Sequence, residues 1–428
     1  MNSTEPVYLA AGLRTPFLKT GGAFAHLDAI ALSLPVAQAM MKKLAGAKPD
    51  FLIWGTVIPN LTWSNIAREV QLDAGIDPTI PSFSTIMACS TSMIGVFEAA
   101  GMIDGKTSQL ALVGGVESMS RIQLGLGQNL SDWLRGFMEA KTFALKLKHF
   151  AKLRLKDIKL WVPKVVNRTS GLSMGQHSEI TAKEWKITRQ EQDALALASH
   201  QRAIAGWEEG FFNDLVVTVN TPGGDISRDG IPRKDTSAER LAKLRPVFDT
   251  TSGNGTLTAG NSSPLTDGAS AIWVGSAEGM AKLPPETPKA RLVDYEVASV
   301  DFHVDGLLMA PAFAVPRLLA RQGLTYADID LWEIHEAFSA QLAYHMKAWE
   351  DETFLRDRVK LTQPLGTFPR DRVNPKGSSV ALGHPFGATG ARILSQAIKE
   401  LSLKPKGARA IVSICADGGL GTVALLQS

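Results

Sequence analysis

Short apolar runs alternate with amphipathic segments over the first 118 residues. Helical spacing of apolar residues predicts helices, and the short apolar runs between them predict strands. The expected strands cover 7–11, 51–54 and 111–113, and the expected helices cover 29–44 and 92–103. The Gly114-Gly115 pair predicts a turn. Because such alternation is typical of sheets with helices on both faces, we expect an α/β fold with a mostly parallel sheet.

The alternation stops at residue 120 and resumes after about residue 245. Within this interruption, Met174 opens one expected helix, and Thr188 with Glu191 three residues later forms a capping box that opens another. The pattern therefore predicts that the segment between residue 120 and about residue 245 is an excursion from a layered core.

The region after residue 285 repeats the order of the first one. A strand at 329–332, a glycine-rich loop leading into a helix at 387–398, and a strand at 410–414 follow one another. The stretch from Cys89 to Glu98 corresponds in spacing to the stretch from His384 to Leu394. This spacing indicates an internal duplication, which would bring two glycine-rich loops to one cleft.

Composition narrows the class of protein. The 428 residues are 45% hydrophobic and 20% charged, with a net charge of +3, as in an ordinary soluble enzyme of more than one domain. Two distant cysteines do not form a disulfide framework, which favours a reducing, cytoplasmic location. The segment 1–6 lacks the pattern of a signal or transit peptide, and no run of about 20 apolar residues predicts a membrane span.

One cysteine stands where a strand gives way to a helix. Small polar residues follow Cys89, and the apolar spacing from Met93 onward is helical. Unpaired N–H groups and the dipole at a helix N-terminus favour a thiolate, so Cys89 is a candidate nucleophile. The alternative is a buried cysteine that packs as a small hydrophobic residue.

Three loops in the last third of the chain carry further reactive groups. They hold His335 after a strand, His384 between glycines and a proline before a helix, and Cys415 ahead of Asp417 and a run of glycines. A single histidine is more often structural than catalytic. Three such loops together with Cys89 favour a catalytic site.

The sequence resembles the thiolase family along almost its whole length. The matching motifs are Met87-Ala88-Cys89-Ser90, Gly114 to Ser120, Leu241 to Pro246, Thr258 to Ser263, Glu336-Ala337-Phe338, Gly383-His384-Pro385, and Cys415 with its glycines. The resemblance implies a five-layered αβαβα fold of two similar halves with an inserted loop domain. The expected parts are the first half in 1–119, a loop domain in 120–245, completion of that half in 246–284, and the second half in 285–428.

The resemblance also implies a mechanism. Cys89, deprotonated by His384, would attack a 3-ketoacyl-CoA, and Cys415 would protonate the departing enolate and activate the incoming CoA. One oxyanion hole would use His384 and a water held by His335, and the other the backbone N–H groups of Cys89 and Asp417. No cofactor beyond CoA as co-substrate, and no metal, is implied.

Two positions depart from the usual family pattern. Many thiolases have Asn at His335, whereas His is similar to the thiolase subunits of trifunctional fatty-acid oxidation complexes. Glycine or alanine is usual at Asp417, where an inward carboxylate would oppose the enolate and an outward one would be harmless. By resemblance, Ser263 and Met174 lie along the pantetheine arm of CoA, while Arg233 could meet its phosphates. Packing in the core is the alternative for Met174.

A basic, apolar insert occupies about 121–168. It holds eleven Lys and Arg residues against three acidic ones, so the remainder of the chain is net acidic. Such segments lie on anionic membranes or partner surfaces, here a β-oxidation partner subunit; the alternative is packing on the substrate tunnel of the enzyme itself. No nucleic-acid motif is present.

The sequence thus predicts a degradative 3-ketoacyl-CoA thiolase, cytoplasmic or peripherally membrane-associated, and dimeric or larger by resemblance. One alternative is a biosynthetic acetoacetyl-CoA thiolase. Another is a non-catalytic lipid carrier or scaffold subunit that keeps the fold, although retention of both cysteines and both histidines argues against it. Ketoacyl synthases are disfavoured because they do not rely on a second cysteine.

Overall fold

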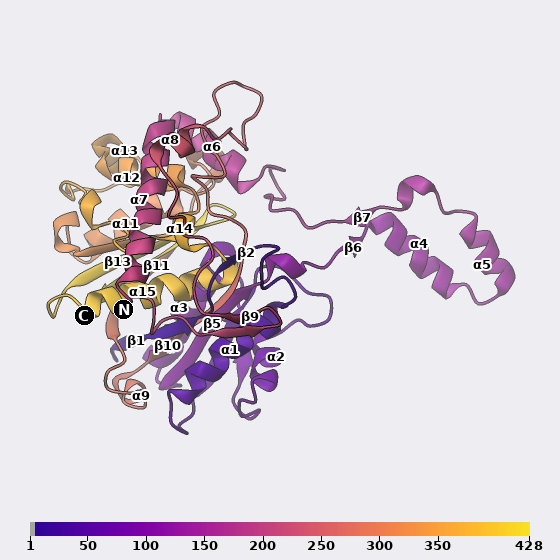
Figure 1. The fold of residues 1–428 in the computed structure, drawn as a ribbon, viewed down its shortest axis with the longest axis horizontal. Coiled ribbons are helices and arrows are strands. Elements are labelled where there is room, and N and C mark those ends of the chain that lie inside the picture. The colour runs from indigo at the N-terminus through magenta and orange to yellow at the C-terminus, as the bar shows by residue number, and fades with distance from the viewer. Residues whose placement is uncertain (1–4) are drawn as a thin grey trace.

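The computed structural model describes residues 5–428, so the first four residues of the 1–6 segment lie outside the description (Figure 1). Its main sheet has ten strands. Along the sheet they are β12 (Leu331–Ile334), β13 (Arg409–Ala416), β14 (Leu420–Gln427), β11 (Lys289–Ser299), β1 (Val7–Arg14), β10 (Thr266–Gly275), β5 (Leu110–Glu117), β3 (Phe51–Gly55) and β4 (Ser82–Phe83), with β2 (Leu18–Lys19) beside β10.

The expectation of a mostly parallel sheet is wrong. Parallel pairs lie only at the two ends, where β12 pairs with β13 and β3 pairs with β4 and β5. The centre is antiparallel because β13 and β14 are joined by a tight turn through Gly418 and Gly419, both at positive φ, and because β10 enters between β1 and β5 after the long excursion. Alternation of strands and helices does not encode these directions.

Helices and sheet form five layers. Helices α3 (Thr91–Asp104) and α15 (Thr389–Ser402) pack together between the two halves of the sheet. Helices α1 (Ala29–Lys42) and α2 (Ile66–Asp73) cover the outer face of the first half, and α11 (Ala310–Arg321) and α12 (Ser339–Glu350) cover that of the second. The strand order β3-β5-β10-β1 corresponds to β12-β13-β14-β11, so the αβαβα fold of two similar halves is confirmed.

Local sequence signals explain several helix boundaries. The predicted capping box of Thr188 and Glu191 is present at the start of α7 (Arg189–Glu208), and Ser173 with Gln176 makes another at the start of α6 (Met174–Glu184). The shorter elements are β8 (Val219–Thr221), β9 (Gly224–Ile226), α8 (Ala238–Ala242), α9 (Ala277–Met280), α10 (Phe302–Asp305), α13 (Glu352–Asp357) and α14 (Ser379–Leu382).

The Gly114-Gly115 pair lies inside β5 and makes no turn. A Cβ atom on Gly114 would come within 2.4 Å of the Trp54 ring, and one on Gly115 within 1.9 Å of the carbonyl oxygen of Gly387. The two glycines therefore permit close approach of neighbouring groups, and Gly115 in particular lets the loop before α15 reach the sheet.

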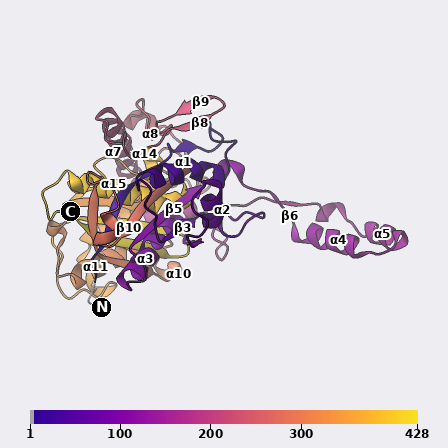
Figure 2. The same ribbon diagram turned by 90° about the horizontal axis from the view of Figure 1, so that it is seen from below.

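A helical arm projects from the layered body, as two perpendicular views show (Figures 1 and 2). It contains β6 (Gly125–Leu126), α4 (Gln128–Glu139), α5 (Phe143–Phe150) and β7 (Leu160–Trp161), with β6 and β7 paired at its base. Trp133 ties the two helices together through ring contacts with Phe150 and a hydrogen bond to the carbonyl of His149. Within the described residues, no helix combines the length and apolar composition needed to cross a bilayer.

Candidate active site

A cavity of about 480 Å³ lies where the N-terminal end of α3 meets loops of the second half. Both cysteines line it, together with His384. Three more predicted site residues, Met174, Ser263 and Asp417, also line its wall. The cavity therefore brings together side chains that are more than 300 positions apart in the chain.

The turn before α3 presents the Cys89 thiol to this cavity. Cys89 lies in a 3₁₀ turn, Ala88–Ser90, and the preceding Ala88 has a φ of +44°. The Thr91 hydroxyl holds the turn, since it accepts from the Met87 N–H and donates to the Ala88 carbonyl. A non-glycine residue at positive φ is costly, and such strain clusters where geometry serves a site.

The imidazole of His384 contacts this thiol. Its Nε2 lies 3.1 Å from Cys89 Sγ, and its Nδ1 lies 2.6 Å from Thr389 Oγ1. The only hydrogen of the Thr389 hydroxyl points to the Pro385 carbonyl, so this oxygen must accept from Nδ1–H. Nε2 is then the unprotonated nitrogen that faces the thiol, which is the arrangement a general base requires.

Burial keeps both members of this pair uncharged. It raises the pKa of the Cys89 thiol to about 12, and the Asp417 carboxylate adds to the rise. It also lowers the pKa of His384 to about 3, with the Arg392 charge acting in the same direction. Desolvation therefore outweighs the effect of the helix N-terminus on the pKa of Cys89, and both groups favour their neutral forms.

His335 lies beside this pair, at the end of β12. Its ring centroid is 4.2 Å from that of His384, and one of its nitrogens lies within 4.8 Å of Cys89 Sγ. Its Nδ1 contacts Ser379 Oγ at 2.8 Å, whereas its buried Nε2 has no partner in the part of the chain that the structure describes. The two histidines and Cys89 offer donor atoms that suit zinc, although the thiol–imidazole hydrogen bond already uses two of them.

Cys415 is the next-to-last residue of β13 and is buried in the same cavity. Burial raises the pKa of its thiol well above the usual value, and the nearby Cys89 adds to this. Two residues on, the Asp417 side chain faces the cavity, where it accepts a hydrogen bond of 2.9 Å from Asn167 Nδ2. Hydrogen bonding by the backbone N–H groups of Cys89 and Asp417 acts in the opposite direction and lowers the pKa of Cys89, although burial outweighs it.

A second cavity of about 620 Å³ adjoins the first. Phe248, Ser263 and Leu265 line both. Arg233 lines only the second cavity, as do Lys19 and the ion pair of Arg240 with Asp235. The Ser263 hydroxyl, at the junction of the two cavities, donates to the Ala337 carbonyl. Met174 lines the thiol cavity and also packs against a core cluster.

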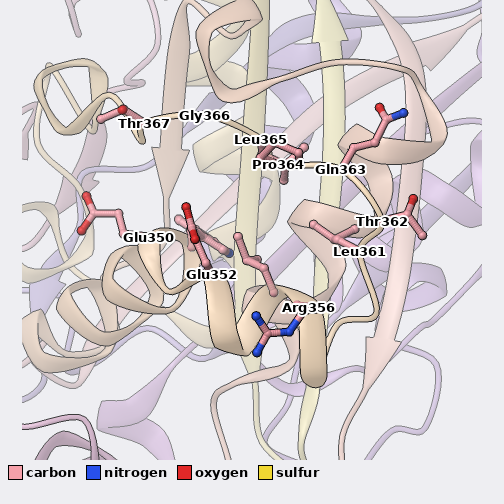
Figure 3. Close-up of a pocket in the computed structure, with 12 residues that line it drawn as sticks. Glu350, Glu352, Arg356, Leu361, Thr362, Gln363, Pro364, Leu365, Gly366 and Thr367 are labelled. Carbon is pink, nitrogen blue, oxygen red and sulfur yellow. The ribbon is translucent and has the colours of Figure 1, made fainter.

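A larger cavity, about 770 Å³, lies elsewhere, in the second half (Figure 3). The described residues that line it run from Trp349 to Arg356 and from Leu361 to Thr367, and they include no thiol and no imidazole. Two of its charged residues are engaged in local ion pairs, Glu350 with Arg370 and Arg356 with Asp357. Its size alone therefore does not make this cavity a candidate active site.

Sequence reasoning gave no role to Glu117, although it lies in one of the family motifs. Its buried carboxylate accepts from the Thr56 hydroxyl and from the N–H groups of Val57, Ile58 and Gly387, and so joins two loops at the rim of the cavity. Burial raises its pKa. A carboxylate at the end of an apolar strand was the signal available for it.

The class of protein follows from this chemistry. A duplicated α/β fold that places a thiol, an uncharged imidazole base and a second thiol at one cavity defines enzymes that transfer acyl groups through cysteine. Comparison with known proteins makes the assignment more specific. The family model "Thiolase, N-terminal domain" matches residues 7–278, and "Thiolase, C-terminal domain" matches residues 286–428.

Full-length relatives and solved structures agree with these matches. The chain is 37% identical to a 3-ketoacyl-CoA thiolase of Pseudoalteromonas translucida and 36% identical to one of Yersinia enterocolitica, covering 99% of this chain and 97% of each relative. The acetyl-CoA acetyltransferase of Bacillus anthracis superposes with a TM-score of 0.80 at 30% identity, covering 100% of both chains. The Acat5 thiolase of Ascaris suum, in complex with coenzyme A, gives 0.79 at 28%, covering 99% of this chain and 100% of that one. This chain belongs to the thiolase family.

Proposed function

We propose that this chain cleaves 3-ketoacyl-CoA with CoA to acetyl-CoA and a shortened acyl-CoA, as a degradative thiolase of fatty-acid β-oxidation. The observation that carries the proposal is the 3.1 Å contact between Cys89 Sγ and His384 Nε2 in a cavity shared with Cys415. The relatives named as 3-ketoacyl-CoA thiolases support the degradative direction.

In the first half-reaction, Cys89 Sγ attacks the 3-keto carbon while His384 takes the thiol proton. The bond between C2 and C3 breaks, the acyl group stays on sulfur as a thioester, and the enolate of acetyl-CoA leaves. Cys415 protonates that enolate at C2 and becomes a thiolate. Because burial raises the pKa of this thiol, it still carries its proton when the enolate forms.

In the second half-reaction, the Cys415 thiolate takes the proton of the incoming CoA thiol. The CoA thiolate attacks the acyl-Cys89 carbonyl, and the proton held by His384 returns to Cys89 as it departs. One oxyanion hole consists of His384 with a water held by His335. The other oxyanion hole consists of the backbone N–H groups of Cys89 and Asp417, and the lowering of the Cys89 pKa by these two groups supports this role.

CoA would occupy the two adjoining cavities, with its phosphates near Arg233 and its pantetheine arm passing Ser263 and Met174 to the thiols. The basic residues that line the second cavity, and the position of Ser263 at the junction of the two cavities, support this path. The CoA complex of the Acat5 thiolase supports CoA as the co-substrate.

The test is thiolysis of acetoacetyl-CoA and of a long-chain 3-ketoacyl-CoA by the full chain. A higher kcat/KM on the long substrate supports the degradative assignment, and activity confined to acetoacetyl-CoA favours the biosynthetic alternative. Failure to turn over either substrate, with no labelling of Cys89 by a thiol-reactive acyl-CoA analogue, would indicate a non-catalytic carrier or scaffold.

We also propose that this chain is a cytoplasmic enzyme and that its arm docks peripherally on an anionic membrane. Its exposed apolar residues support this, since Met138 is 79%, Phe143 82% and Leu155 90% exposed, and they lie among the cations of the insert. Its projection from the body argues against packing of the helices on the tunnel, although Val165 and Val166 at its base do line the thiol cavity. Dimerisation remains a proposal that rests on the resemblance alone.

A further inference from the structure

We propose that Ser379, oriented by Arg392, is a positioning residue that fixes His335 in the tautomer with its proton on Nε2. The inference rests on the proposed function, because it gives His335 its role as hydrogen-bond donor beside Cys89. It rests on three contacts of buried side chains.

The hydroxyl of Ser379 has two partners. Arg392 Nη2 donates to Ser379 Oγ at 2.6 Å, and His335 Nδ1 lies 2.8 Å from the same oxygen. A guanidinium only donates, so the hydroxyl oxygen must accept from it. The single hydroxyl hydrogen is then free to point at His335 Nδ1.

The alternative tautomer is costly here. If Nδ1 carried the proton, Ser379 Oγ would accept twice and its own hydrogen would be buried without a partner. With Nδ1 as the acceptor, every hydrogen of the contact is used, and Nε2 carries the ring proton. That Nε2 is the buried atom of His335 that has no partner within residues 5–428, so its N–H is free to donate to the water of the proposed oxyanion hole.

Two hydroxyl groups thus place the ring proton on opposite nitrogens of the two imidazoles. The Thr389 hydroxyl gives its hydrogen to the Pro385 carbonyl, which leaves His384 Nε2 unprotonated and able to act as a base. The Ser379 hydroxyl accepts from Arg392 and gives its hydrogen to His335, which makes His335 Nε2 a donor. Burial lowers both pKa values and favours neutral rings; Arg392 acts in the same direction on both, after the neighbouring His384 in the case of His335.

The first test reads the tautomers directly in the resting full chain. Long-range ¹H–¹⁵N spectra of histidine-labelled protein, assigned with His335→Asn and His384→Asn, should show Nε2–H for His335 and Nδ1–H for His384. Ser379→Ala should add an Nδ1–H population at His335 alone. Nδ1–H at His335 in the unaltered protein, or an unchanged tautomer in Ser379→Ala, overturns the proposal.

The second test is kinetic. Ser379→Ala should lower kcat about tenfold, the effect of one buried hydrogen bond, while KM changes less than twofold. In a His335→Asn background, Ser379→Ala should lower kcat no further, and an additional loss there would show a merely structural role and overturn the proposal. Ser378→Ala is the matched control, since Ser378 is also buried and lies near Arg392, with its Oγ 3.5 Å from Nη1.

The experiments distinguish a failure of the proposed function from a failure of the inference about His335. If the unaltered protein shows no thiolysis, the proposed function is wrong, and the spectra still decide the tautomer of His335.

Discussion

The layered body and the projecting arm use the same residue types in opposite ways. In the body, apolar side chains of α3 and α15 are buried between the sheet halves, and a few polar groups converge on one cavity. In the arm, every residue of α4 and α5 is at least partly exposed, and the apolar ones lie among cations. The body thus holds the reactive groups, whereas the arm exposes apolar and cationic side chains, as the proposed docking requires.

This comparison predicts opposite effects for changes in the two regions. Changes in the cavity should abolish turnover and leave membrane docking intact, and changes in the arm should do the reverse. The experiments below follow the expected effect on turnover, from the largest to the smallest.

Replacement of the nucleophile should have the largest effect. Cys89→Ala should lower thiolysis by at least about 10⁴-fold, because no acyl-enzyme can form. Mass spectrometry after mixing with 3-ketoacyl-CoA should find no acylated protein, whereas the unaltered chain carries the acyl group on Cys89. Thiolysis within tenfold of the unaltered chain would contradict the mechanism.

Replacement of the second thiol should have a smaller effect on turnover. Cys415→Ala should reduce kcat by about 10²- to 10⁴-fold, the usual contribution of one acid–base group. The direct acylation of Cys89 by a reactive acyl thioester should persist, because that step needs His384 and not Cys415. Loss of that acylation as well would show that Cys415 supports the pocket and does not act as the acid.

Removal of the acidic charge beside Cys89 should make its thiol more reactive. Burial is the main cause of the raised pKa, and Asp417 is the second, so Asp417→Asn should lower the pKa of Cys89 from about 12. Alkylation by iodoacetamide at pH 8 should then be about fivefold faster, the effect of about 1 kcal/mol of charge repulsion. The rate should still rise with pH, since only the thiolate reacts. An equal or slower rate would mean that the Asp417 carboxylate does not act on this sulfur.

Charge reversal in the arm should have the smallest effect on turnover. Lys146→Glu with Lys148→Glu should leave kcat within about twofold, since α5 lies on the projecting arm and its residues do not line the thiol cavity. The same variant should lose binding to vesicles of phosphatidylglycerol and phosphatidylcholine at low salt, measured by co-sedimentation.

The matched control for the arm removes two exposed cations from the body, as Lys106→Glu with Lys406→Glu. Vesicle binding should persist in this variant. If the unaltered chain does not bind the vesicles, or if the two variants bind equally, the membrane role of the arm is wrong, and a partner subunit becomes the occupant to test.

Much of this architecture was predictable because local sequence patterns determine it. The capping box of Thr188, the helix after Cys89 and the duplication of the two halves all follow from spacing within short stretches. The sheet directions were not predictable, since β10 reaches its neighbours across the excursion of the chain. The expected turn at Gly114-Gly115 was wrong for a related reason: the need for glycine arises from Trp54 and Gly387, which are distant in sequence.

The sequence by itself determined which reactive groups this protein has and, through its motifs, the family to which it belongs. Tertiary structure alone decided their state: burial keeps Cys89 and His384 neutral, and the hydroxyls of Thr389 and Ser379 decide where each ring proton lies. The physical reason is that a pKa and a tautomer depend on solvent exclusion and on neighbours within hydrogen-bonding distance, and the fold supplies both.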